Sequence, residues 1–108
     1  MKVSLIVPAY NEEASIAKTL ESLNVQTYFD IELIVVDNNS VDNTNAIART
    51  YTDNVISETQ QGYIYAVNRG AKEATGELIS ICDADSIYPN DWVSKVVNEF
   101  QKYPNAVA

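Results

Sequence analysis

The chain contains no histidine, and its 108 residues include one cysteine, three glycines and seven lysines and arginines. Without histidine it can form neither a Ser-His-Asp nor a Cys-His nucleophile arrangement, nor any metal site that needs an imidazole ligand. Its single cysteine, Cys82, excludes an internal disulfide and is expected to be a small buried hydrophobe in a reducing compartment. Any chemistry on this chain must therefore use carboxylates.

Positive charge is also scarce. Fifteen aspartates and glutamates against seven basic residues give a net charge of −8, which is the wrong sign for binding nucleic acid or an anionic membrane. The apolar runs are far shorter than the roughly 18 residues of a membrane span, and the N-terminus has no signal-peptide pattern. We therefore expect a cytoplasmic location, at the cytosolic membrane face if the chain belongs to a longer protein, with no membrane span here and no nucleic-acid partner.

Apolar runs of strand length recur along the chain. Those at residues 3–8 and 31–36 are rich in β-branched residues, which is typical of strands buried on both faces of a parallel sheet. Two further strands are predicted at residues 54–57 and 78–82. Residues 106–108 have the composition expected at the start of another strand.

Four amphipathic segments fill the gaps between these strands. Asn11 is expected to cap the first helix, and Ser40 or Asp42 the second. Gly76 is expected to stop the third helix, and Pro89 to occupy the first position of the fourth. The inward faces of the four helices are predicted to carry Ile16, Leu20 and Leu23, then Ala46, Ile47 and Tyr51, then Val67, Gly70, Ala71 and Ala74, and finally Val93, Val96, Val97 and Phe100.

The regular alternation of strand and helix predicts an α/β fold, a mostly parallel sheet with helices on both faces. No linker or low-complexity segment interrupts residues 1–108, so we expect a single domain, and its 46% apolar content is enough to form a core. Such sheets bind ligands just beyond the carboxyl ends of their strands.

An acidic loop stands at one of these ends. The apolar run at residues 78–82 stops abruptly at Asp83-Ala84-Asp85. Two carboxylates separated by one small residue can point into one pocket, and hard oxygen ligands suit Mg²⁺ or Mn²⁺. Taken alone, such a tripeptide is more often a solvated turn.

No glycine-rich loop follows the first strand, where residues 8–12 read Pro-Ala-Tyr-Asn-Glu. Rossmann dinucleotide-binding folds and nucleoside triphosphatases need glycines there, because backbone amides must approach the phosphates closely. The same absence weakens a sugar-phosphate nucleotidyltransferase interpretation. Two like charges about 5 Å apart at an effective dielectric near 20 repel by about 3 kcal/mol, so the bare acidic pair would oppose a phosphate ligand. A bound diphosphate would therefore need its charge offset by a divalent metal, Mn²⁺ or Mg²⁺, on Asp83 and Asp85.

Four segments carry further motifs in a fixed order. They are VSLIVPAYNE at residues 3–12, VVDNNS at 35–40 with Asp42, Gly62 followed by AVNRG at 66–70, and ATGE at 74–77 leading to Asp83-Ala84-Asp85. Together they resemble the family 2 glycosyltransferases, which have the Rossmann-like A-type fold of nucleotide-diphospho-sugar transferases. The resemblance covers the whole chain but only the nucleotide-sugar-binding half of such an enzyme. The acceptor-binding half is expected to be absent and the fold therefore truncated.

The resemblance also implies roles for individual residues. Asp85 is similar to the family's metal ligand and Asp83 to the acid that reaches the ribose or a metal-bound water. The pair at Asp37 and Asn38 stands where the family commonly has two acids that read the base and ribose. Asn38 departs from that pattern: its amide oxygen can accept from a uracil imide N–H but without a charge-assisted bond, which leaves the base open. The nucleoside pocket is expected to be lined by Pro8, Ala9, Tyr10, Glu12 and Ala84, with Tyr10 against the base.

By resemblance, the chain is the donor-binding part of an inverting hexosyltransferase-like enzyme that transfers a sugar from a UDP- or GDP-linked donor to a hydroxyl. Its catalytic base is expected beyond Ala108, so the isolated chain should be inactive. One alternative is a non-catalytic nucleotide-sugar-binding or assembly module. Another is an unrelated phosphoryl-transfer domain, although those place Asp-x-Asp after the first strand. The strand at residues 78–82 should lack one neighbour, and its exposed edge should favour homo-oligomers.

Overall fold

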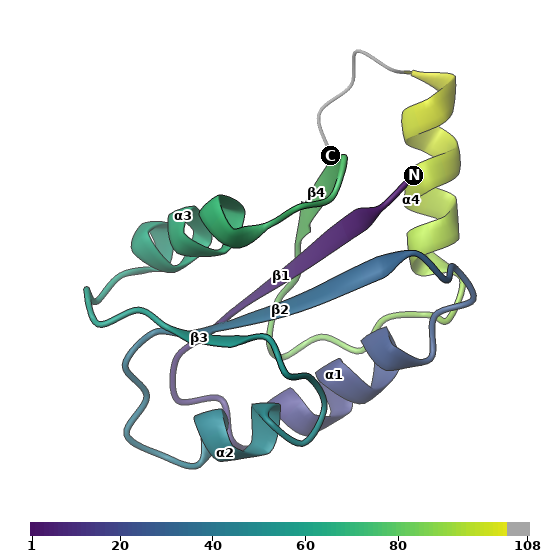
Figure 1. Cartoon of the computed structure of the whole chain (residues 1–108). Coiled ribbons are helices and arrows are strands. Elements are labelled where there is room, and N and C mark those ends of the chain that lie inside the picture. Colours follow the sequence, from purple (N-terminus) through teal and green to yellow (C-terminus); the bar gives the residue numbers. More distant parts are fainter. Residues whose placement is uncertain (104–108) are drawn as a thin grey trace.

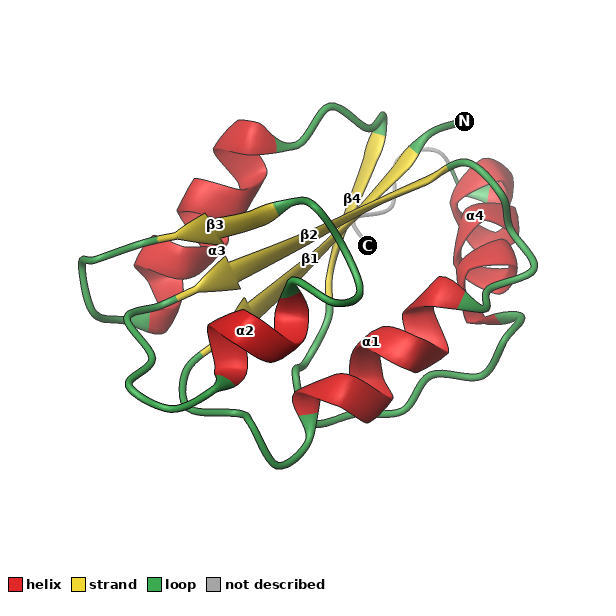
Figure 2. Cartoon of the chain, turned by 60° about the horizontal axis from the view of Figure 1, so that its bottom comes forward, coloured by secondary structure: helices red, strands yellow, loops and turns green. Residues whose placement is uncertain are grey.

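The computed structural model describes residues 1–103, and within them four strands alternate with four helices. In chain order these are β1 (Val3–Ala9), α1 (Ile16–Asn24), β2 (Ile31–Asp37), α2 (Thr44–Ala48), β3 (Val55–Ser57), α3 (Tyr63–Glu73), β4 (Leu78–Ile81) and α4 (Trp92–Lys102). The strands form one parallel sheet in the order β3-β2-β1-β4 (Figures 1 and 2). The predicted α/β fold is confirmed.

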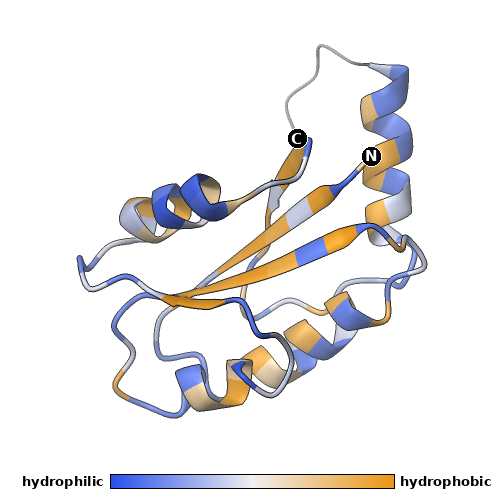
Figure 3. Cartoon of the chain, in the orientation of Figure 1, coloured by the Kyte–Doolittle hydropathy of each residue, from blue (hydrophilic) through white to orange (hydrophobic). Residues whose placement is uncertain are grey.

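Successive residues of β1 point to opposite faces of the sheet, and both faces are covered. Leu5 and Val7 pack into the larger core beneath α1, α2 and α4, whereas Ile6 packs into a smaller core beneath α3. Figure 3 shows the result, apolar strands between helices that are apolar on one side and polar on the other. This two-sided burial explains why β1 and β2 are almost continuously apolar.

Gly70 allows the backbone of helix α3 to pack directly against side chains of the sheet. A Cβ at this position would stand 2.4 Å from Cγ2 of Ile6 and 3.2 Å from Cγ2 of Val36. The predicted inward position of Gly70 is confirmed, together with its partly buried neighbours Val67 and Ala74. Ala71, however, is exposed, and Ala66 is buried, because the inward face of α3 is centred on Ala66 and Gly70, which lie one turn apart.

The other predicted helix faces agree with the structure except at Ala46. That residue is exposed on α2, and the neighbouring Thr44 and Ala48 are buried instead. The remaining residues predicted for these helix faces are buried or packed against the larger core, although Tyr51 lies beyond the end of α2: Ile16, Leu20, Leu23, Ile47, Tyr51, Val93, Val96, Val97 and Phe100.

Four predicted helix boundaries are wrong. The residue at the N-cap of α2 is Asn43, not Ser40 or Asp42. Helix α1 begins at Ile16, not directly after Asn11, because Asn11 has φ of 52° and hydrogen-bonds to a different loop. Pro89 precedes the first residue of α4 by one turn, and its carbonyl accepts a hydrogen bond from the Trp92 N–H. Gly76 lies three residues beyond the end of α3 and donates its N–H to Ser4 Oγ.

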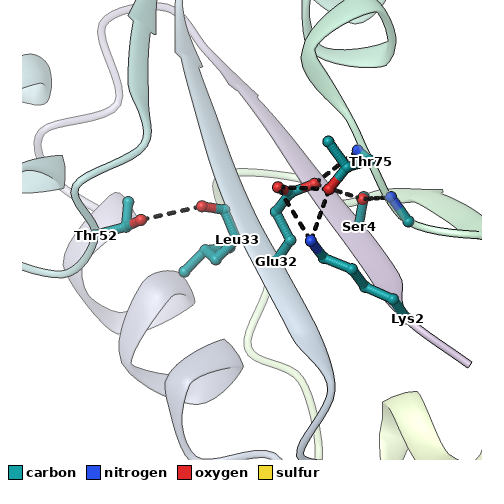
Figure 4. A network of polar contacts seen from close by, with 7 residues as sticks. Lys2, Ser4, Glu32, Leu33, Thr52 and Thr75 are labelled. Atoms are coloured by element: carbon teal, nitrogen blue, oxygen red, sulfur yellow. Dashed lines mark hydrogen bonds and ion pairs between the residues drawn. The ribbon is translucent and has the colours of Figure 1, made fainter.

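A polar network closes the amino end of the sheet (Figure 4). Glu32 accepts hydrogen bonds from Ser4 Oγ at 2.7 Å and from the N–H and hydroxyl of Thr75 at 2.9 and 3.0 Å. Lys2 Nζ lies 3.7 Å from the same carboxylate and donates to the Thr75 hydroxyl. The network joins β1 and β2 to the turn before β4 and so fixes where β4 begins.

Strand β4 lies at one edge of the sheet in the described part of the chain, since it pairs with β1 alone. Its last residue, Ile81, is 37% exposed. The strand predicted at residues 106–108 lies outside the described residues. Over residues 1–103, none of the helices combines the length and the hydropathy of a membrane span.

Candidate functional site

A hollow of about 190 Å³ lies where the carboxyl ends of β1, β2 and β4 meet the N-terminus of α3. Parallel pairing of Ala9 with Asp37 places the ends of β1 and β2 side by side, and β4 ends next to β1. The hollow is lined by Pro8, Ala9, Tyr10, Glu12, Asn38, Tyr63, Ala66, Cys82, Asp83, Ala84 and Asp85. It contains every site residue expected from the sequence except Asp37.

Hydrogen bonds hold the loop after β1 to the loop after β2. The Asn11 side chain accepts the Val41 N–H at 3.0 Å, and the Asn11 N–H donates to Ser40 Oγ at 2.9 Å. The N–H of Glu12 donates to the hydroxyl of Thr44 at 2.8 Å. This cross-loop bonding, in place of a helix cap, is what leaves Tyr10 and Glu12 at the pocket.

Side chains at the start of α1 hold the acidic loop of residues 83–85 in place. The Thr19 hydroxyl donates to the carbonyl of Ala84 at 3.0 Å, and Ser15 Oγ lies 3.1 Å from the same oxygen. On the other side, the Asp83 N–H donates to the hydroxyl of Tyr88 at 2.9 Å. The backbone between the two aspartates is thereby held, while both aspartate residues remain exposed to solvent.

Cys82 and Tyr88 lie under this loop as neutral groups. Burial, with a smaller contribution from the charge of Asp83, raises the pKa of the Cys82 thiol to about 12 against the opposing effect of a hydrogen bond with Tyr88. Burial also raises the pKa of the Tyr88 hydroxyl. The thiol is therefore not a nucleophile near neutral pH, and the expectation of a buried, inert cysteine is confirmed.

Asp37 is 5% exposed and has a local structural role. Its carboxylate accepts the Ser40 N–H at 3.1 Å and the Asn45 side-chain amide at 2.9 Å. These bonds shape the turn between β2 and α2.

Asn38 lines the hollow, but its amide is fully engaged with the chain itself. Its Nδ2 donates to the carbonyls of Glu58 and Gln60, at 3.0 and 2.8 Å. Its Oδ1 accepts the Gly62 N–H at 2.9 Å and lies 3.5 Å from the Gln61 side-chain amide.

The pocket is acidic. Its lining includes Glu12, Asp83 and Asp85 but neither lysine nor arginine. Residues 1–103 contain no group of three or more acidic, cysteine or histidine side chains able to enclose a metal ion. Two carboxylates nevertheless suit Mg²⁺ or Mn²⁺, which commonly bind through one or two protein carboxylates together with waters and substrate phosphates. The residues present therefore fit a cation that is shared with a phosphate ligand.

Comparison with known proteins identifies the family. The model of glycosyl transferase family 2 matches residues 4–108. The chain belongs to this family. Similar curated proteins include the glycosyltransferase AglE of Haloferax volcanii, 36% identical over 89% of this chain, and the glucosyl-dolichyl phosphate glucuronosyltransferase of the same organism, 30% identical over 100%. The chain spans 34% and 37% of their lengths.

Solved structures of similar proteins have the same fold. Residues 1–349 of Staphylococcus aureus TarS superpose with a TM-score of 0.87 at 28% identity, covering 96% of this chain and 33% of that one. The mannosyltransferase PcManGT of Pyrobaculum calidifontis, solved with GDP-Man and Mn²⁺, also gives 0.87, at 32% identity over 92% of this chain and 32% of its own. These similarities confirm the predicted A-type glycosyltransferase fold, and the family 2 assignment excludes the unrelated phosphoryl-transfer domain.

Several residues at this family 2 site were not anticipated from the sequence. Tyr63 and Ala66 line the pocket from α3, and Thr19 and Tyr88 hold the acidic loop. For Thr19 a signal was present, because a hydroxyl side chain among the apolar residues of an amphipathic helix needs a buried partner. For Tyr63 there was none, because its place in the pocket depends on how α3 crosses the sheet.

Proposed function

We propose that this chain is the donor-binding part of an inverting glycosyltransferase, which takes a sugar from a nucleotide diphosphate and transfers it to a hydroxyl acceptor. The observation that carries the proposal is the acidic hollow at the carboxyl ends of β1, β2 and β4, lined by the motif residues of family 2. Relatives support it: TarS has been solved with UDP and with UDP-GlcNAc, and PcManGT with GDP-Man.

We assign the nucleoside to the part of the hollow formed by Pro8, Ala9, Tyr10, Glu12 and Ala84. Tyr10 is 50% exposed beside this pocket, so a base can stack on its ring without displacing a packed side chain. Asp37 accepts one hydrogen bond at each carboxylate oxygen, so it keeps lone pairs that can accept from the base or ribose, and we retain it as a candidate contact. Asn38 has both amide hydrogens committed to the carbonyls of Glu58 and Gln60, and donation to the nucleotide would require these bonds to break.

Asp85 would hold a divalent cation, with Asp83 contributing directly or through water. The cation, when bound, offsets the negative charge that grows on the departing diphosphate. Mn²⁺ or Mg²⁺ fits the two carboxylates, and PcManGT and a mycobacterial glucosyl-3-phosphoglycerate synthase have been solved with these ions. This chain's own contribution is to keep both carboxylates exposed on a loop that Thr19 and Tyr88 hold in place.

Deprotonation of the acceptor hydroxyl needs a general base, and the carboxylates that line the hollow, Glu12, Asp83 and Asp85, are those we assign to the nucleoside and the cation. We propose that the base and the acceptor site lie in a second half of the enzyme, and that residues 1–108 by themselves form one nucleotide-sugar-binding domain without transfer activity. The alternative of a non-catalytic binding or assembly module makes the same prediction for binding. The two differ in whether the full-length protein transfers sugar.

We also propose that the isolated chain self-associates through β4, whose outer edge is unpaired within the described residues. Burying roughly 400 Å² of apolar surface at about 25 cal/mol per Å² contributes on the order of 10 kcal/mol before the costs of association. A cytoplasmic location, at the cytosolic membrane face in a longer protein, fits the acidic composition and the single free cysteine.

Isothermal titration calorimetry of the chain with UDP and with GDP, each with and without Mn²⁺, tests the donor-binding proposal. We expect binding with Mn²⁺ and little binding after EDTA treatment, because the lining offers no cation of its own. Equal affinity in EDTA would contradict the metal role, and absence of binding in all four titrations would contradict donor binding altogether.

A further inference from the structure

We propose that Asn38 is a positioning residue: it holds the loop of residues 58–62, and through it the first turn of α3, as one wall of the nucleotide pocket. The inference rests on the proposed function for the identity of the ligand. It differs from that function in assigning to Asn38 a contact with the protein in place of a contact with the base.

The Asn38 amide hydrogen-bonds to three backbone groups of this loop. Two backbone carbonyls, those of Glu58 and Gln60, lie within 3.0 Å of Nδ2, and the Gly62 N–H donates to Oδ1 at 2.9 Å. Because two carbonyls face one end of the amide and an N–H faces the other, the first end must be the nitrogen and the second the oxygen. The residue is 3% exposed, so these bonds lie away from competing water.

Gly62 connects Asn38 to α3. The Gly62 carbonyl accepts the N–H groups of Tyr65 and Ala66 at 3.2 Å, which begins the helix. Gly62 has φ of 141°, a conformation that side chains rarely adopt, so the chain turns at this residue directly into Tyr63. Anchoring Gly62 to Asn38 therefore places both Tyr63 and Ala66 at the pocket.

An amide at position 38 satisfies this loop, whereas a carboxylate would not. An aspartate there would replace the two amide donors with a second acceptor oxygen, and its charge would face the Glu58 and Gln60 carbonyls at hydrogen-bond distance. The backbone carbonyls of this loop therefore accept hydrogen bonds from an asparagine at position 38 but would repel a carboxylate there. This is a structural reason for the departure from the acidic pair common in the family.

Two hypotheses can now be separated with Asn38→Asp. If Asn38 reads the base, the carboxylate should raise the affinity for UDP relative to GDP, because it accepts more strongly from an imide N–H. If Asn38 holds the loop, affinity for both nucleotides in Mn²⁺ should fall together, at least about fivefold, with the ratio unchanged. Protonation restores one donor, so this loss should shrink as the pH is lowered.

Asn39→Asp is the matched control, since it adds the same charge one residue away at an exposed side chain. Affinities of Asn38→Asp are therefore compared with those of Asn39→Asp at each pH, which removes the effect of acid on the metal site. A raised UDP to GDP ratio, or losses equal to those of Asn39→Asp, would overturn the proposal.

Amide hydrogen exchange on the nucleotide-free chain tests the contact independently of the proposed function. Asn38→Ala removes the acceptor of the Gly62 N–H, so Gly62 should lose protection while strand amides such as Val35 keep theirs. Unchanged protection of Gly62 would overturn the proposal even if nucleotides bind. Loss of protection at the Gly62 amide supports its hydrogen bond to Asn38 even if calorimetry shows no nucleotide binding. In that case only the proposed function fails. If Asn38→Ala does not fold, the Asn38→Asp comparison decides.

Discussion

The hydroxyl of Thr19, on the buried face of α1, donates a hydrogen bond of 3.0 Å to the carbonyl of Ala84, the residue between the two aspartates of the acidic loop. Thr19 is fully buried, and Ser15 Oγ lies 3.1 Å from the same carbonyl. The first helix of the fold thus supports the loop that we assign to metal binding, 65 residues further along the chain.

Thr19→Val should therefore weaken both the fold and the metal site. It replaces the hydroxyl with a methyl of similar size, and Ser15 compensates in part, so we expect a loss of about 1 kcal/mol in the free energy of unfolding. Urea titration measures this loss, and calorimetry should show weaker Mn²⁺-dependent UDP binding. Thr50→Val is the control, because the Thr50 hydroxyl donates to the Ile47 carbonyl at an exposed site. Equal effects of the two substitutions would show that the Ala84 contact has no special importance.

Asp85→Ala should abolish the Mn²⁺-dependent part of nucleotide binding, and Asp83→Ala should reduce it less. The reason is that Asp85 is proposed as the direct ligand, while Asp83 can act through water. Asp53→Ala is the control: it removes an exposed aspartate just before β3, at the opposite end of the sheet from the pocket. Calorimetry with UDP or GDP compares the three variants. If the Asp83 and Asp85 variants bind like the parent chain, the acidic loop is a solvated turn.

Acid should destabilise the chain through Glu32. Burial acts to raise its pKa, but hydrogen bonds from Thr75 and Ser4 and the charge of Lys2 outweigh it and hold the pKa below the usual 4.5. A lowered pKa in the folded state contributes stability above about pH 4.5, which is lost as the pH falls through the folded-state value.

Glu32→Gln should accordingly lower the free energy of unfolding at pH 7 by about 2 kcal/mol, through the loss of charge-assisted hydrogen bonds. It should also flatten the fall in stability below pH 4.5. Urea titrations at pH 7 and pH 3.5 measure both effects. Glu21→Gln, at an exposed position of α1, serves as control. An acid dependence identical in Glu32→Gln and the parent chain would rule out this explanation.

Self-association through β4 predicts a mass above the 12.0 kDa of one chain when light scattering follows a sizing column at micromolar concentration. Ile81→Lys should shift the chain toward the monomer, since it places a charge on the last residue of the edge strand. Ile87→Lys makes the same change at a 69% exposed loop residue and should have no such effect. A parent chain that elutes as a monomer would mean that the open edge is tolerated.

Much of the fold follows from the sequence itself. The strands β1 and β2 are continuous β-branched runs, and such runs are stable only between two covering layers. Gly70 could be placed against the sheet because small residues recur there at helical spacing. The position of Asp83 and Asp85 beyond a buried strand was likewise evident, since it depends on adjacent residues alone.

The tertiary structure decided what depends on partners distant in the chain. Asn11 is a residue type that commonly caps helices, yet its side chain accepts a hydrogen bond from the Val41 N–H because the loops after β1 and β2 lie side by side. Asn38 looks like a base-reading residue, yet its amide is engaged by residues 58–62, which the pairing of β3 with β2 brings near. Local sequence specifies which polar groups are available. Which of them meet is determined by the register of the sheet and the crossing of its helices.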